Sequence, residues 1–160
     1  MTELGRGGGD AGDADVVLLA SPGTVVAEAL AGVSGLQGKV ILDATNRIAS
    51  QTPPPAGHDS VAEYVKATTG GSVAKVFHLN YAAILDRAAT GARRPGNLWV
   101  GDEEARAAVE QLSADIGMEA VYGGPLERAA TAEAFTEILI SIRQEAGDPI
   151  FYRFATPENL

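Results

Sequence analysis

The sequence contains no cysteine and only two histidines, His58 and His78. A disulfide framework and a thiolate metal site are therefore excluded, and so is a histidine-rich metal centre. No apolar run approaches the roughly 18–20 residues that cross a bilayer. Residues 1–15 are rich in Gly and Asp and lack the apolar core of a signal peptide. We therefore expect a cytoplasmic protein without a membrane span and without a bound metal.

Positive charge is also scarce. The chain has 12 Lys and Arg against 21 Asp and Glu, which gives a formal net charge of −9. Residues 1–100 carry 9 acidic and 8 basic side chains, whereas residues 101–160 carry 12 and 4. Nucleic-acid binding is not expected, because neutralising phosphates requires clustered Lys and Arg. An anionic cofactor is expected on the nearly neutral first part of the chain.

The 160 residues, 46% of them apolar, suffice for one domain with a hydrophobic core. Short apolar runs alternate with helical patterns along the chain. The expected strands are Val16–Ala20, Val40–Leu42, Val73–Phe77, Asn97–Val100 and Ala120–Tyr122. The first run is continuous, as in a strand buried on both faces. This alternation predicts an α/β fold with a largely parallel sheet.

Capping residues mark where the helices begin and end. Thr24 and Asp102 are expected N-caps, and Ser60 with Glu63 has the spacing of a capping box. Gly117 is expected to end the helix that follows Asp102. The longest predicted helix runs over residues 126–145. Its apolar face, predicted to be core or a dimer contact, consists of Phe135, Ile138, Leu139 and Ile142.

The segment Gly7–Gly12 formally matches the dinucleotide-binding pattern G-x-G-x-x-G. That pattern binds a pyrophosphate only when a strand precedes the first glycine and a helix begins at the last. Here only six residues precede it, and the next predicted element is a strand. We therefore interpret residues 1–14 as a flexible glycine-rich leader.

Four segments carry a resemblance to one family. They are Asp15–Pro22 (DVVLLASP), Leu42–Asn46 (LDATN), Ala74–Asn80 (AKVFHLN) and Gly123–Ala129 (GGPLERA). In this order and spacing they resemble the NADPH-dependent coenzyme F-420 reductases, the 8-hydroxy-5-deazaflavin:NADP oxidoreductases. Two positions depart from the family: Ser21 replaces the usual aliphatic residue, and His78 the more usual Asn.

The resemblance implies an incomplete Rossmann-like, doubly wound parallel sheet with a C-terminal helical segment. The family begins with a strand, a glycine-rich turn and a helix that have no counterpart here, so the chain is expected to be N-terminally truncated. Residues 15–100 would form the second part of the dinucleotide-binding domain, and residues 101–160 a C-terminal α/β extension with the long helix. The implied reaction is hydride transfer between NADP(H) and the deazaflavin coenzyme F-420. Both partners bring their own chemistry, so no catalytic residue is expected.

Ligands of an open α/β sheet lie beyond the carboxyl ends of its strands. By resemblance, the ribose and nicotinamide end of NADP lies against the loops after the first two strands. The residues assigned to it are Ala20, Ser21, Pro22, Thr45 and Asn46. The alternative is turn chemistry alone, because Pro, Thr and Asn are common where strands end.

The loop after the third strand is expected to bind the substrate through His78, Asn80 and Tyr81. His78 is alternatively a buried histidine whose ring is satisfied by a backbone carbonyl. The pair Arg93-Arg94 either grips the anionic tail of a deazaflavin or is a solvated pair of loop bases. His58 is assigned no role.

Without the first strand of the family, residues 16–20 would form an open apolar edge. We therefore expect either that this chain is not the true gene product or that it forms a homo-oligomer through this edge, and we expect weak affinity for NADPH. The choice between NAD and NADP stays open, because the residue that reads the ribose 2′ position follows a strand that this sequence lacks. Two other readings stay open: another acceptor, such as a flavin, ferric ion or imine, and a non-catalytic interaction module. The module would be a stable oligomer without affinity for dinucleotides.

Overall fold

The computed structural model describes residues 8–47 and 53–159. The strands are β1 (Gly9–Asp10), β2 (Val16–Leu19), β3 (Val33–Ser34), β4 (Val40–Asp43), β5 (Ser72–Lys75), β6 (Gly96–Gly101) and β7 (Glu119–Tyr122). The α-helices are α1 (Val26–Ala31), α2 (Val61–Thr69), α3 (Arg106–Asp115) and α4 (Ala129–Ala146). Short 3-10 helices occupy Gly23–Val25, Ala82–Thr90, Glu103–Ala105, Leu126–Arg128 and Pro157–Asn159. None of the helices in these ranges has the length and apolar composition of a membrane span.

One five-stranded sheet organises the fold, with the order β2-β4-β5-β6-β7. Strands β2, β4 and β5 are parallel, β6 runs antiparallel to β5, and β7 is parallel to β6. The segment between β5 and β6 contains the 3-10 helix Ala82–Thr90 in place of an α-helix. The predicted α/β fold with a largely parallel sheet is confirmed, with one antiparallel pair in it.

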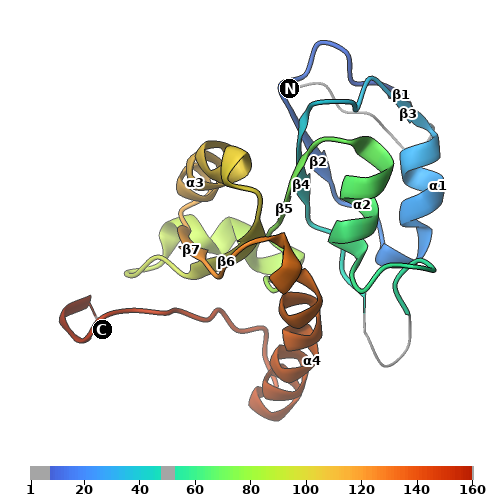
Figure 1. Ribbon diagram of the computed structural model, residues 1–160. Coiled ribbons are helices and arrows are strands. Elements are labelled where there is room, and N and C mark those ends of the chain that lie inside the picture. The colour runs from blue at the N-terminus through green and yellow to red at the C-terminus, as the bar shows by residue number, and fades with distance from the viewer. Residues whose placement is uncertain (1–7, 48–52, 160) are drawn as a thin grey trace.

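Helices cover both faces of the sheet, as Figure 1 shows. Side chains alternate between the two faces along a strand, so neighbours on β4 enter different cores. Ile41 packs with residues of α1, α2 and the start of α4, whereas Leu42 packs with Trp99 and with Val109 of α3. Both β4 side chains are fully buried. Each such burial contributes about 1.5–3 kcal/mol to stability.

Strand β2 differs from the buried strand that the sequence predicts. Its side chains alternate between half-buried and exposed, with Val16 37% and Leu18 53% exposed. Val17 and Leu19 pack against the core under α1 and α2. In the part of the chain that the structure describes, β2 pairs with β4 alone, so its other edge is open. The prediction of burial on both faces is wrong because no described element covers the outer face.

The glycine-rich segment is only partly as predicted. Residues 1–7, and with them Gly7, lie outside the described residues. Gly9–Asp10 forms β1, which pairs with β3 in a separate two-stranded parallel sheet. The Asp10 carboxylate accepts a hydrogen bond from the Gly12 N–H at 3.0 Å, and Ala11 is buried. A flexible leader is therefore wrong for residues 8–14, whereas the element that follows them is, as predicted, the strand β2.

Two predicted N-caps are wrong. Thr24 lies inside the 3-10 turn that precedes α1, and α1 begins without a side-chain cap. The Asp102 carboxylate caps no helix; it pairs with Lys66 of α2 at 2.6 Å and accepts the Val73 N–H of β5 at 2.8 Å. These tertiary partners replace the local cap. Gly117 ends α3 as predicted, with a φ of 77° that favours glycine.

Candidate functional site

The loops that leave β2, β4 and β5 lie side by side at one edge of the sheet. The Gly23 N–H donates to the Asn46 carbonyl at 3.1 Å, and the Asn46 side-chain amide donates to the His78 carbonyl at 2.8 Å. A Cβ at position 23 would lie only 2.7 Å from the Asn46 oxygen, so this approach requires glycine. Three segments far apart in sequence therefore form one site at the carboxyl ends of parallel strands.

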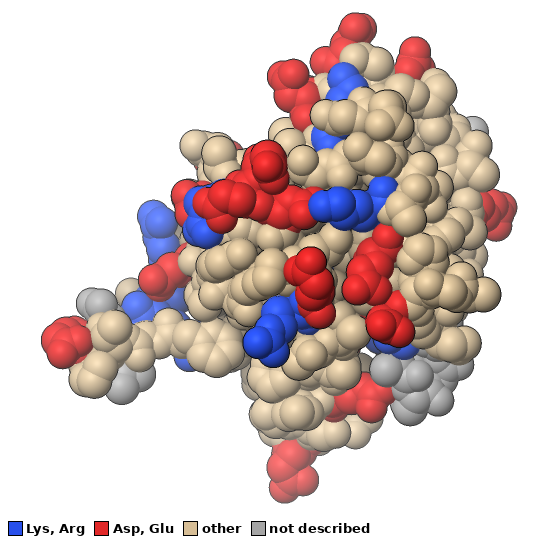
Figure 2. Space-filling view, viewed as in Figure 1, with Lys and Arg blue, Asp and Glu red and all other residues tan. Residues whose placement is uncertain are grey.

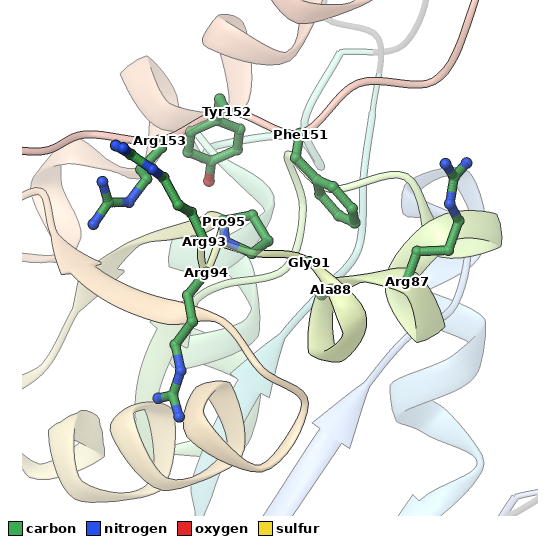
Figure 3. A pocket seen from close by; sticks show the side chains of 9 residues that line it. All are labelled: Arg87, Ala88, Gly91, Arg93, Arg94, Pro95, Phe151, Tyr152 and Arg153. Carbon is green, nitrogen blue, oxygen red and sulfur yellow. The ribbon is translucent and has the colours of Figure 1, made fainter. Parts of the chain in front are cut away.

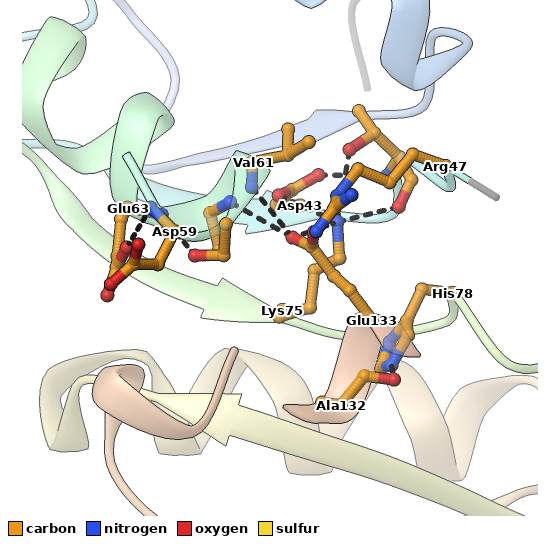
Figure 4. Close-up of polar contacts among 12 residues, drawn as sticks. Asp43, Arg47, Asp59, Val61, Glu63, Lys75, His78, Ala132 and Glu133 are labelled. Atoms are coloured by element: carbon orange, nitrogen blue, oxygen red, sulfur yellow. Dashed lines mark hydrogen bonds and ion pairs between the residues drawn. The ribbon is translucent and has the colours of Figure 1, made fainter. Parts of the chain in front are cut away.

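A buried ion cluster, defined by Asp43, Arg47, Lys75 and Glu133, underlies these loops (Figure 4). The Lys75 ammonium group is fully buried and lies 3.0 Å from an Asp43 oxygen and 3.3 Å from a Glu133 oxygen. It also donates to the backbone carbonyl of Thr45 at 2.7 Å and to its hydroxyl at 3.1 Å. The lysine therefore fixes the loop after β4.

Glu133 connects helix α4 to the rest of the cluster. One carboxylate oxygen accepts from Arg47 at 2.7 Å. The other accepts the N–H groups of Val61 and Ala62 at 2.9 and 3.3 Å, at the start of α2. A carboxylate there satisfies free amide groups and faces the positive end of the helix dipole. The predicted cap of α2 is also present, because the Ser60 hydroxyl accepts the Glu63 N–H at 3.1 Å.

His78 lies beside this cluster and is almost completely buried. Its Nε2 lies 3.2 Å from the Ala132 carbonyl of α4, which makes Nε2–H the donor. Burial, together with the positive charge of Lys75, lowers the pKa of His78 from 6.5 to about 3. The ring is therefore neutral near pH 7, and its Nδ1 is an acceptor without a hydrogen-bond partner among the described residues.

A small cavity, the His78 pocket, opens at this edge of the sheet and has a volume of about 80 Å³. Its lining consists of Asn46, His78, Leu79, Asn80, Tyr81, Thr136, Leu139, Ile140, Arg143, Ile150 and Tyr152. Within the described part of the chain, three buried polar atoms of this lining have no hydrogen-bond partner: His78 Nδ1, Asn80 Oδ1 and Thr136 Oγ1. Buried polar atoms are seldom left unpaired. These three therefore indicate a place for a polar ligand group.

The rim of the His78 pocket carries aromatic and cationic groups. The Arg143 guanidinium lies over the Tyr81 ring, 4.3 Å from its centroid. The Tyr152 hydroxyl accepts the Leu98 N–H at 2.7 Å, and burial raises the pKa of this hydroxyl. Tyr152 is therefore a neutral, fixed wall, whereas the more exposed Tyr81 and Arg143 present a cation–π pair at the entrance.

Phe77, the second residue of the loop after β5, has a φ of 61°, a left-handed conformation that is uncommon outside glycine. Its N–H donates to the Asn97 side chain at 3.2 Å, and its carbonyl accepts the Asn80 N–H at 3.3 Å. These bonds hold the strained turn that brings His78 and Asn80 to the same cavity.

The structure brings together four of the residues that the sequence assigns to ligands: Asn46, His78, Asn80 and Tyr81. The other assigned residues lie outside this lining. Ala20, Ser21 and Pro22 precede Gly23, which contacts Asn46, and the Ser21 hydroxyl is buried without a hydrogen-bond partner among the described residues. Thr45 is fully buried, and its hydroxyl is occupied by Lys75.

Several residues of the site are absent from the sequence-based assignment. Thr136, Arg143 and Tyr152 line the cavity, and Lys75 and Glu133 support it. The sequence could have indicated Thr136. It is a polar residue four positions after Ala132 and three before Leu139, so helical spacing places it on the apolar side of α4. The described residues contain no group of three or more Asp, Glu or His side chains that could hold a metal ion.

Comparison with known proteins identifies structures with a similar fold. No protein-family model matches the sequence, and no curated protein matches it. A crystal structure from Arthrobacter sp. FB24, named as a candidate F420-dependent NADP reductase, matches with a TM-score of 0.75 and 25% identity over 91% of this chain and 72% of its own. A hypothetical protein from Sinorhizobium meliloti matches with a TM-score of 0.61 and 28% identity over 73% of this chain and 60% of its own. The chain therefore has a mixed α/β, Rossmann-like fold similar to that of the Arthrobacter protein.

Proposed function

We propose that this chain is an NADP-dependent oxidoreductase that transfers hydride between NADPH and the deazaflavin coenzyme F-420. The observation that carries the proposal is the His78 pocket, which lies at the carboxyl ends of parallel strands and whose lining has three buried polar atoms without a hydrogen-bond partner among the described residues. The similarity in fold to a protein named as an F420-dependent NADP reductase supports it. The resemblance of four sequence segments to the same family agrees with this assignment.

In this proposal the nicotinamide end of NADP lies against Ala20, Ser21 and Pro22 and against Asn46. Thr45 supports this loop through Lys75 rather than by touching the cofactor, since its side chain is buried. Ser21 has a buried hydroxyl without a partner among the described residues, which a ribose or carboxamide group would satisfy. The nicotinamide supplies or accepts the hydride, and the chain supplies position and shielding from water.

The His78 pocket would hold the polar edge of the deazaflavin. A pyrimidine-dione ring edge carries N–H and C=O groups side by side. His78 Nδ1 and Asn80 Oδ1 are acceptors for N–H groups, and the Thr136 hydroxyl donates to a carbonyl. Neutral His78 keeps this acceptor available over the whole physiological pH range. No acid or base of the protein is needed for the hydride step.

The open edge of β2 supports the further proposal that the chain forms a homo-oligomer. Val16 and Leu18 are exposed on a strand that has one partner in the described residues. Such an edge recruits another strand.

The test is a fluorescence titration of the full chain with F-420, followed by absorbance assays of NADPH oxidation with F-420, a flavin, ferric ion and an imine. We expect F-420 to bind and to be the acceptor. Thr136→Val should weaken F-420 binding about three- to tenfold through one lost hydrogen bond. Thr131→Val, at an exposed position of the same helix, is the matched control and should leave binding unchanged.

Each other outcome contradicts a defined part of the proposal. Oxidation of NADPH by a flavin, ferric ion or imine, without activity on F-420, would mean that the acceptor is that compound and not F-420. A stable oligomer that binds neither F-420 nor NADPH would make the chain a non-catalytic interaction module. If Thr136→Val and Thr131→Val lose the same amount of F-420 affinity, the His78 pocket is not part of the binding site.

A further inference from the structure

The C-terminal strap, residues 148–156, follows α4 and forms one wall of the His78 pocket. Figure 1 shows the chain after α4 in an extended course, and the space-filling view in the same orientation shows its end standing out from the body (Figure 2). Ile150 and Tyr152 of the strap line the pocket, whereas the other lining residues come from α4 and from the loops after β4 and β5. One wall of the pocket is therefore a single segment outside any helix or strand.

The His78 pocket is smaller than an ordinary ligand site. Its volume is about 80 Å³, whereas cavities that enclose a small organic ligand measure about 300–1,000 Å³. Tyr152 also lines a second cavity, of about 190 Å³. Figure 3 shows the C-terminal strap on one side of this second cavity and the segment before β6 on the other. The Tyr152 side chain is thus a wall common to two small cavities, so moving it would join them.

Tyr152 fastens the C-terminal strap to β6. Strand β5 pairs with β6 at Val100 and Gly101. Farther along β6, the Gly96 N–H donates to the Tyr152 carbonyl at 2.7 Å, and the Leu98 N–H donates to the Tyr152 hydroxyl, also at 2.7 Å. Alternate residues of a strand point their N–H groups to the same edge, so the strap continues the edge that β5 leaves. Both bonds end on one residue, and one movement of the strap breaks them together.

The rest of the C-terminal strap is held weakly. None of the residues from 148 to 156 is buried, and Phe154 is 49% exposed. Arg153 pairs with Glu119 at 3.6 Å, but the glutamate side chain is 52% exposed, and such surface pairs contribute little. Gly147 joins the strap to α4 with a φ of 75°, and a Cβ there would meet open space. Segments with little buried surface are those that open locally at low cost.

We infer that the C-terminal strap is a gate for the His78 pocket. It moves away from β6 as one unit, pivoting at Gly147, and this movement joins the two cavities and admits a ring. It then closes over the bound ring, with Tyr152 again fixed on β6. The identity of the ligand rests on the proposed function, whereas the opening of the strap rests on the contacts of Tyr152.

Amide hydrogen exchange of the isotopically labelled full chain, followed by NMR, measures the opening directly. The N–H groups of Gly96 and Leu98 bond to Tyr152, so they exchange whenever the C-terminal strap opens. The N–H groups of Gly101 and Gly123 join β6 to the chain around β7, at 3.1 and 2.8 Å, and report on the opening of the sheet itself. We expect Gly96 and Leu98 to share one protection factor, at least about tenfold below those of Gly101 and Gly123.

Tyr152→Phe removes the hydroxyl and keeps the ring. Losing this one hydrogen bond should raise the population of the open strap about three- to tenfold. Exchange at Gly96, whose own bond is unchanged, should therefore speed up by the same factor. Tyr122→Phe removes a hydroxyl from a partly exposed tyrosine outside both cavities and is the control, which should leave this exchange unchanged.

Stopped-flow fluorescence with F-420 tests whether the opening controls entry. Both association and dissociation should be about three- to tenfold faster in Tyr152→Phe, because a ligand enters and leaves only while the gate is open. In a static pocket the substitution would change mainly the dissociation rate. Tyr122→Phe should bind F-420 at the wild-type rates.

Three results would overturn the inference. They are equal protection of Gly96, Leu98, Gly101 and Gly123, faster exchange in Tyr152→Phe at Leu98 alone, and an unchanged rate of F-420 association in Tyr152→Phe. In the third case F-420 still binds, so the proposed function survives without the gate. If F-420 does not bind, the proposed function fails, and hydrogen exchange alone decides whether the C-terminal strap opens.

Discussion

Replacing Glu133 by glutamine tests whether the buried ion cluster holds the fold and the site together. The cluster has two carboxylates and two cations, and Glu133 contacts both Lys75 and Arg47. Glutamine has nearly the same shape, so the substitution leaves no large cavity. It does leave the cluster with an uncompensated positive charge.

The hydrogen-bond geometry around Glu133 explains why a glutamine amide at this position cannot satisfy all of its neighbours. If its oxygen stays on the Val61 N–H, its NH₂ group faces the Arg47 guanidinium, which is also a donor. If the amide flips, two donors meet at the start of α2 instead. Removing one partner of a buried ion pair costs about 3–5 kcal/mol. In a chain of this size, that lowers the Tm by about 6–20 °C.

The assay is urea and thermal unfolding followed by circular dichroism. Glu145→Gln, at an exposed position of the same helix, is the control and should change the free energy of unfolding by less than about 0.5 kcal/mol. Lys75→Met combined with Glu133→Gln leaves one carboxylate, that of Asp43, and one cation, that of Arg47, in the cluster and restores charge balance. The double variant should therefore lose at least about 1 kcal/mol less than the sum of the single losses. A loss below about 1 kcal/mol in Glu133→Gln would refute the reasoning.

Three other perturbations follow from the structure. Burial lowers the folded-state pKa of His78 to about 3 against 6.5 for the free side chain, so between these values the unfolded state binds the extra proton. The free energy of unfolding should fall by up to about 1.4 kcal/mol per pH unit below pH 6.5, and urea titrations of His78→Asn should lack this slope. Gly23→Ala places a Cβ 2.7 Å from the Asn46 oxygen and should cost about 1–3 kcal/mol in thermal unfolding; an unchanged Tm would mean that the two loops separate easily. Leu18→Lys, on the exposed face of β2, should leave the fold intact and lower the mass seen in sedimentation, unless the chain assembles through another surface.

The strands were predictable because apolar runs mark them directly. The predicted and observed bounds of β4 and β7 differ by a single residue at one end. The same signal was misleading for β2, because an unbroken apolar run says nothing of whether a neighbour covers its outer face. Local capping rules were reliable for Ser60, whose partner is three residues away. They were wrong for Asp102, whose carboxylate binds partners on α2 and β5.

The ion cluster could not be read from the sequence. Lys75 and Asp43 are 32 residues apart, and Arg47 and Glu133 are 86 apart. In the run Val73–Phe77, a lysine between apolar residues is ordinarily the one that faces solvent. Only the fold shows that its neighbour is the loop after β4. The sequence did predict that the loops after β2, β4 and β5 lie together, because parallel strands bring their carboxyl ends to one edge.

The cluster and the His78 pocket act as one unit, which explains why charges are buried beneath a small cavity. Lys75 holds Thr45 and so the loop that carries Asn46. Glu133 anchors α4 one turn before Thr136, and His78 bonds to the carbonyl of Ala132 beside it. The walls of the pocket are thus set before a ligand arrives, which reduces the ordering cost of binding. At a temperature where Glu133→Gln remains folded, F-420 binding should therefore weaken, although Glu133 does not line the cavity. Unchanged affinity in that variant would mean that the cluster stabilises the fold without shaping the site.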